Sequence, residues 1–202
     1  MTERSRAGRG RRPGTPDTRA EILGSARSLF AERGFKGTSM RAIASEAGVD
    51  PALVHHYFGT KDDLFMAALQ LPVDPRELLA PVIAGGKDDA AVGLLRTFLS
   101  VWDDPDNQLA FLSLFRSVLD PPGELLLSQG FVPVVLGPVG HALGIDHPEA
   151  RMPVVASQMI GLIMCRYVLR LEPLASMDPE TLVATYGPTI QRYLTGDLPF
   201  DS

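Results

Sequence analysis

Hydrophobic residues recur three and four positions apart along most of the chain, which is the spacing of helices that bury one face. No stretch alternates hydrophobic and polar residues as a half-buried strand does. The pattern therefore predicts an all-α fold. Gly and Pro interrupt residues 124–143, which predicts two short or kinked helices there. The other predicted helices cover approximately residues 16–33, 40–47, 51–58, 62–71, 75–83, 90–102, 106–119 and 148–170, and a last one begins at residue 179.

The second and third predicted helices are joined by a tight turn. Thr38 or Ser39 can cap the second helix, and Gly48 suits the left-handed residue that ends it. Asp50 can cap the third helix, and Pro51 then occupies its first position, where the missing N–H costs nothing. Two helices joined in this way form a helix-turn-helix, whose second helix enters the major groove of DNA.

The surface of this pair that would face DNA follows from helical geometry. If Val54 and Phe58 turn inward, the remaining side chains of the third helix point outward, and no acidic residue lies among them to repel phosphate. Arg41 is a long cation suited to guanine, and Lys61 begins the next helix, where a phosphate can bind. We predict DNA contacts from Thr38, Ser39, Arg41, Pro51, Ala52, His55, His56, Tyr57 and Lys61.

Residues 18–65 resemble the DNA-binding domain of the TetR/AcrR family of bacterial transcriptional regulators. The matching positions include Leu29-Phe30, Gly37-Thr38-Ser39-Met40, Ile43-Ala44, Ala47-Gly48-Val49, Tyr57-Phe58 and Thr60-Lys61. The resemblance implies a homodimer formed through the last two helices, operator DNA as a partner, and a small-molecule site in the C-terminal part. The family often has two aromatic residues where this chain has His55-His56, so the resemblance implies no particular operator sequence.

Charge is distributed unevenly along the chain. The formal net charge is -5, yet residues 1–61 hold 11 Lys and Arg against 6 Asp and Glu, whereas the other residues hold 8 against 18. A nucleic-acid-binding protein with an acidic body would carry its cations where it touches phosphate. The first 14 residues include five arginines among Gly, Ser and Pro, so we predict a disordered basic arm over residues 1–15. This arm either follows the minor groove of DNA or serves only as a solubilising tail.

Two domains follow from these patterns. We expect a three-helix helix-turn-helix DNA-binding domain over residues 16–62 and a helical ligand-binding and dimerisation domain over residues 63–202. Residues 154–169 are hydrophobic nearly all round a helix, so this helix must be covered on several sides. The last helix also carries a hydrophobic stripe. These two helices predict either a subunit interface, as the family resemblance implies, or a single intrachain core.

The middle of the C-terminal domain has the composition of a ligand pocket. Residues 90–170 combine many hydrophobic residues with Gly and Pro, which hinder dense packing, and with few polar groups. We predict that a small, largely apolar effector binds between these helices and weakens DNA binding. The candidate pocket residues, each of which also suits a core position or a structural ion pair, are Phe98, Trp102, Phe111, Phe115, Arg116, His141, Gln158 and Arg166.

Other classes of function find little support in the sequence. No P-loop, Rossmann glycine pattern or nucleophile elbow is present, and no histidine has a Cys or carboxylate at metal-ligand spacing. We therefore predict no enzyme, no metal and no cofactor. No run of about 18 apolar residues is free of charges, so no membrane-spanning helix is expected. The single cysteine, Cys165, permits no internal disulfide and suits a core position better than a redox switch, which favours a cytoplasmic location.

Together these features predict a homodimeric, ligand-responsive repressor that binds a pseudo-palindromic operator. Two alternatives remain open at this point. One is a transcriptional activator of the same fold. The other is a helical small-molecule-binding or interaction protein that has no operator function, against which the basic arm, Arg41 and Lys61 argue.

Overall fold

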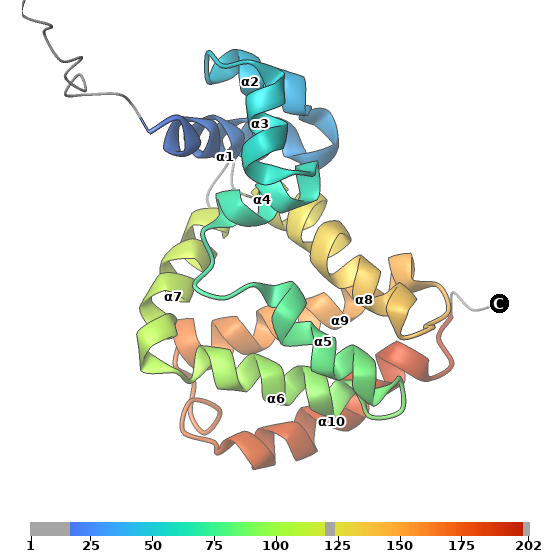
Figure 1. Ribbon diagram of the computed structural model, residues 1–202. Coiled ribbons are helices and arrows are strands. Elements are labelled where there is room, and N and C mark those ends of the chain that lie inside the picture. Colours follow the sequence, from blue (N-terminus) through green and yellow to red (C-terminus); the bar gives the residue numbers. More distant parts are fainter. Residues whose placement is uncertain (1–16, 120–123, 200–202) are drawn as a thin grey trace, which may run out of the picture.

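The protein consists of helices throughout the residues that its computed structural model describes, 17–119 and 124–199, which confirms the predicted all-α fold (Figure 1). The basic arm predicted for residues 1–15 lies outside the described residues. No helix within the described ranges is long and apolar enough to cross a membrane. The N-terminal helices form one end of the molecule and the remaining helices form a larger body beside them (Figure 1).

Local capping explains where the N-terminal helices begin. The side chains of Asp17, Ser39 and Asp50 each accept a hydrogen bond from a backbone N–H of the first turn that they precede. Thr60 and Asp63 form a reciprocal capping box at the next helix. The four helices that result are α1 (Thr18–Gly37), α2 (Met40–Glu46), α3 (Pro51–Phe58) and α4 (Lys61–Leu69).

The end of α1 differs from the prediction and changes the role of Thr38. A break at Gly34, whose φ is 68°, is followed by one further turn to Gly37. The extra turn brings the Thr38 hydroxyl within 2.9 Å of the carbonyl oxygens of both Leu29 and Gly34, so it can donate to either. Thr38 is therefore a buried residue of the junction, and Ser39 caps α2.

The larger body contains two segments whose hydrogen bonds run from residue i+5 to residue i, that is, π-helices. The first, η1, contains Pro133, which has no N–H to offer to a regular helical ladder, and it continues directly into α8. The second, η2, continues α9. The elements of this body are α5 (Pro75–Gly85), α6 (Ala90–Trp102), α7 (Pro105–Leu119), η1 (Leu126–Leu136), α8 (Gly137–Ala142), α9 (Pro148–Leu162), η2 (Ile163–Val168) and α10 (Pro179–Thr195).

Packing in this body follows the hydrophobic stripes. Helix α6 packs against both α5 and α10, α9 packs against α10, and η1 packs against α8, α9 and the N-terminal helix α1. The nearly all-round hydrophobic surface of α9 is covered in part by the chain itself, since Val155 and Leu162 are buried and Met159 and Ile160 face a cavity. Intrachain contacts thus account for much of the pattern that suggested a subunit interface.

Arg151, in the first turn of α9, joins this helix to the C-terminal end of α10. Its side chain is almost fully buried, with 1% of the residue exposed. Nη1 donates to the carbonyl oxygens of Tyr193 at 3.1 Å and Gly196 at 2.8 Å, and Nη2 donates to the Asp146 carboxylate at 3.1 Å. The first turn of α9 is thereby fastened to the C-terminal end of α10.

Candidate functional site

The turn between α2 and α3 has the geometry that the sequence predicted. Gly48 has a φ of 66°, a left-handed conformation that glycine adopts without steric cost, and the Val49 N–H donates to the Ala44 carbonyl oxygen at 2.9 Å. Val54 is fully buried and Phe58 is 7% exposed. These two residues anchor α3 and fix which of its side chains face outward.

The outward face of α3 is exposed and carries no acidic residue. Large hydrophobic side chains contribute to it, because 40% of Leu53 and 44% of Tyr57 are exposed. The predicted contact residues that are exposed on α3 are Pro51, Ala52, His55, His56 and Tyr57, and Ser39 and Arg41 are exposed on or beside α2.

The two histidines of α3 present different groups. The Nδ1 of His55 lies 3.0 Å from the Gly59 carbonyl oxygen, which requires Nδ1 to carry the proton and leaves Nε2 to meet another partner. The His56 ring packs edge-on against the Tyr57 ring, with centroids 5.6 Å apart. One ring is therefore held in place by the backbone and the other by its neighbour.

Two of the predicted DNA contacts lie in surroundings that the sequence did not reveal. Thr38 is only 2% exposed, so its side chain is not available to DNA, and its inclusion among the contacts is corrected. Lys61 is half-buried, and its Nζ lies 4.2 Å above the centre of the Phe35 ring. Burial lowers the pKa of Lys61, and the neighbouring Asp62 carboxylate opposes this shift.

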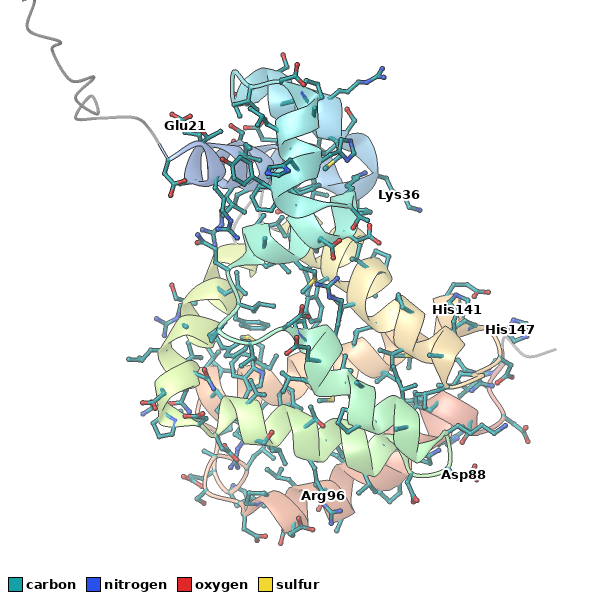
Figure 2. All side chains as sticks on the ribbon, viewed as in Figure 1. Glu21, Lys36, Asp88, Arg96, His141 and His147 are labelled. Carbon is teal, nitrogen blue, oxygen red and sulfur yellow. The ribbon has the colours of Figure 1, made fainter. Side chains whose placement is uncertain are left out.

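A further cation beside α3, Arg19, was not predicted from the sequence. The guanidinium of Arg19, at the start of α1, lies 5.1 Å from the centre of the Phe58 ring and remains exposed. Lys36, near the other end of α1, is also exposed (Figure 2). No local spacing links Arg19 to the C-terminal end of α3, because Arg19 and Phe58 are far apart in the sequence and meet only in the folded chain.

The second candidate site is a cavity of about 210 Å³ within the larger body. Thr97 is the one polar residue in its wall, and no ionisable side chain lines it among the described residues. Trp102 lies at the centre of an aromatic cluster, with its ring centroid 5.4 Å from that of Phe111 and 5.8 Å from that of Phe98. The aromatic residues that line the cavity are Phe98, Trp102, Phe111, Phe115 and Phe131.

Of the eight predicted pocket residues, only the four aromatic ones, Phe98, Trp102, Phe111 and Phe115, line this cavity. Arg116 and His141 are exposed, and His141 lies on the outside of α8 (Figure 2). Gln158 is half-buried and donates to the Ser157 hydroxyl at 3.4 Å. These three residues do not line the cavity, because an apolar wall offers their polar groups no hydrogen-bond partner.

Arg166 is the fourth predicted pocket residue that does not line the cavity. Its Nη1 donates to the carbonyl oxygens of Leu174 and Met177, both at 2.8 Å, and its Nη2 lies 3.3 Å from the Asp103 carboxylate. The Tyr167 hydroxyl also donates to Asp103, at 3.0 Å. Burial, reinforced by the Asp103 charge, raises the pKa of Tyr167 and keeps the phenol a donor. This cluster therefore fastens the segment between η2 and α10.

Comparison with known families identifies the chain. Residues 22–68 match the family described as bacterial regulatory proteins, tetR family, and residues 88–194 match the tetracyclin repressor-like C-terminal domain. The second match alone covers more than half of the chain. The protein belongs to the TetR family. The matched description of that family is one of bacterial regulatory proteins.

Curated relatives in the TetR family match only part of this chain. The HTH-type transcriptional regulator BetI of Brucella anthropi is 40% identical over 83 residues, which cover 41% of this chain and 38% of that protein. BetI of Burkholderia ambifaria is 30% identical over 102 residues, which cover 42% of this chain and 53% of that protein. The chain thus matches about two-fifths to half of the length of these relatives.

Solved structures of the family align over most of this chain. A TetR-family regulator from Streptomyces coelicolor A3 is 40% identical, and the alignment covers 92% of this chain and 98% of that one, with a TM-score of 0.46. The multidrug binding protein EbrR, in complex with ethidium, is 21% identical, with coverage of 89% and 99% and a TM-score of 0.46.

Proposed function

We propose that this TetR-family protein is a homodimeric repressor that binds a pseudo-palindromic operator and releases it when an apolar effector occupies the cavity. The observation that carries the proposal is the exposed face of α3. This eight-residue helix is anchored by Val54 and Phe58, and its other side chains are exposed and include no carboxylate. Such a face can approach base edges without repelling phosphate.

The C-terminal helices support a two-fold dimer. The residues of α10 from Thr181 to Thr189 include several exposed side chains and no charged one. In the segment between η2 and α10, 56% of Leu169 and 49% of Leu171 are exposed. The centre of a protein interface is depleted in charged residues, so a second copy of the chain suits this surface. A two-fold dimer presents two α3 helices to two half-sites, which is why the operator should be an inverted repeat.

The cavity determines the class of effector. A wall without ionisable side chains offers no counter-charge, so an ion would lose its hydration without compensation. Apolar cavities of about 150 Å³ bind benzene, so a volume of about 210 Å³ suits an uncharged compound with one or two aromatic rings. Methylnaphthalene is a simple representative of this class. If it weakens operator binding tenfold, linkage requires that it bind the DNA-bound protein about 1.4 kcal/mol more weakly.

Selection of duplexes from a random pool by the purified protein tests this function. The recovered sequences should share an inverted repeat, and light scattering should give a dimer at micromolar concentration. Affinity for the selected duplex should fall with salt at a log–log slope of about −0.9 per phosphate neutralised. A monomer in solution, or a pool without any repeat after selection, would contradict the proposal. Binding that methylnaphthalene leaves unchanged would contradict its effector part alone.

Substitutions should separate base contacts from phosphate contacts. Arg41→Ala and His56→Ala are each expected to reduce discrimination between the selected duplex and random DNA by about 1–3 kcal/mol, since both side chains are exposed beside the groove-facing surface. Lys61→Ala should weaken both DNAs about equally, because a phosphate contact carries no sequence information. Parallel gel shifts on the two DNAs provide the measurement. A loss confined to the selected duplex for Lys61→Ala would refute this division of roles.

A further inference from the structure

The π-helical segment η1 touches two parts of the molecule at once. Its residues Phe131 and Val132 line the cavity. The preceding residues Gln129 and Gly130 meet the N-terminal helices instead, Gln129 at Gly34 of α1 and Gly130 at Phe65 of α4. Figure 1 shows this segment in yellow, running from beside α4 into α8. One short element is therefore both a wall of the cavity and a neighbour of the DNA-binding helices.

The contact between η1 and α4 is so close that it leaves no room for an added methyl group. A Cβ placed on Gly130 would overlap the Phe65 ring, lying only 2.6 Å from its Cε2 atom. Phe65 itself is fully buried, and side chains in a close-packed interior have little freedom to turn away. The backbone of η1 thus lies directly against the ring, and a displacement of η1 toward α4 would press on it.

From Phe65 the packing continues to a predicted phosphate contact. The Phe65 ring meets Phe30 and Phe35 of α1 edge-on, with centroids 5.2 Å and 5.4 Å apart. Phe35 in turn lies under the ammonium group of Lys61, 4.2 Å from the ring centre. A continuous series of contacts therefore joins η1 to the first residue of α4, which lies directly after the helix-turn-helix.

We propose that η1 transmits occupancy of the cavity to the DNA-binding helices through the packing of Gly130 on Phe65. The inference rests on the proposed effector site. A ligand that expands the cavity presses on Phe131 and Val132, and a close-packed segment responds by shifting as a unit. The π-helical turns of η1 fit such a role, because π-helical turns within α-helices occur frequently at functional sites.

A second route from the cavity runs through α4 itself and must be distinguished. Leu69, the last residue of α4, also lines the cavity. Helix α4 has only nine residues, and the residue that follows it, Gln70, has a φ of 52°, which ends the helix before the chain reaches α5. Motion along this route would not depend on the contact between Gly130 and Phe65, so substitutions at that contact separate the two.

The test compares two glycines of the same helical run. Gly130→Ala adds a methyl group against Phe65, whereas Gly137→Ala adds the same group where the nearest atom, the Val132 carbonyl oxygen, lies 3.9 Å away. Without ligand, Gly130→Ala should bind the selected duplex at least about tenfold more weakly than wild type, and Gly137→Ala should stay within about twofold. Adding Phe65→Leu to Gly130→Ala should restore most of the affinity, because the smaller side chain makes room for the methyl group.

Two results would overturn the proposal. One is operator binding by Gly130→Ala equal to that of Gly137→Ala, and the other is a double variant no better than Gly130→Ala alone. If circular dichroism shows that Gly130→Ala is unfolded, Phe65→Leu alone decides: release of the duplex by methylnaphthalene should shrink at least about threefold relative to wild type, and unchanged release rejects the proposal. Failure of the wild type to bind any duplex would instead refute the proposed function.

Discussion

Replacement of Arg151 by methionine is expected to lower the free energy of unfolding by about 3 kcal/mol. Methionine has enough volume to fill the site but cannot donate to the carbonyl oxygens of Tyr193 and Gly196, which Arg151 contacts at 3.1 Å and 2.8 Å. Buried ion pairs can often be replaced by hydrophobic residues, because both charges are then removed. Here the main partners are backbone carbonyls, which remain and lose their donor.

Asp146 contributes little to this expected loss. Its side chain is 62% exposed, so water can replace the Arg151 guanidinium around its carboxylate. The carbonyl oxygens of Tyr193 and Gly196 at the end of α10 are part-buried, so water replaces their lost donor less readily. Helix α10 is also the proposed dimer helix, so the loss should include a weaker dimer.

Chemical denaturation of the two variants Arg151→Met and Arg96→Met measures the effect. Arg96 also joins two helices, since its Nη2 lies 2.8 Å from Glu180 of α10, but both side chains are largely exposed. Its replacement should leave the urea midpoint almost unchanged. Equal midpoints for the two variants would show that the carbonyl contacts of Arg151 do not stabilise the fold.

The helix-turn-helix could be predicted from sequence because its determinants are local. Ser39, Gly48 and Asp50 each act on backbone groups within a few residues, and the structure uses each as the pattern indicated. The prediction that Thr38 contacts DNA is wrong because the Thr38 hydroxyl instead donates to the carbonyl oxygens of Leu29 and Gly34. These carbonyl groups become available only through the break in α1.

The cavity could be predicted only in part. Helical spacing gives the angle of a residue around its own helix but not what lies on that side. The aromatic residues Phe98 and Trp102 were found because size and hydrophobicity direct them inward. Arg166 was misplaced because its partners are carbonyl groups of a later loop. The sequence gives no indication that η1 contributes to the cavity wall, because Gly130 and Pro133 predict breaks in a helix.

Introducing a carboxylate into the cavity should reverse its preference for uncharged ligands. Met159 lies on α9 and lines the cavity, where no ionisable group is present among the described residues. Met159→Glu is expected to weaken methylnaphthalene binding about 30-fold, equivalent to about 2 kcal/mol, because an apolar ligand would bury the carboxylate without a partner. N-methylquinolinium, a cation of nearly the same shape, supplies the missing charge and should become the better ligand.

The pH dependence of Met159→Glu has a definite sign. Burial raises the pKa of a carboxyl group, so the introduced side chain is neutral at low pH and charged at high pH. Affinity for N-methylquinolinium should therefore rise, and affinity for methylnaphthalene should fall, as the pH increases through that raised pKa. Met159→Gln is the matched control, because it adds a polar group of the same size without a titratable charge, and its affinities should not change with pH.

The emission of Trp102, the single tryptophan of the chain and part of the cavity wall, reports binding of both compounds. Release of the selected duplex should follow the same concentration range as the change in emission, with N-methylquinolinium acting on Met159→Glu and methylnaphthalene acting on the wild type. If Met159→Glu and Met159→Gln respond alike to the cation, the compounds bind elsewhere. The cavity would then have no role in controlling DNA binding through such ligands.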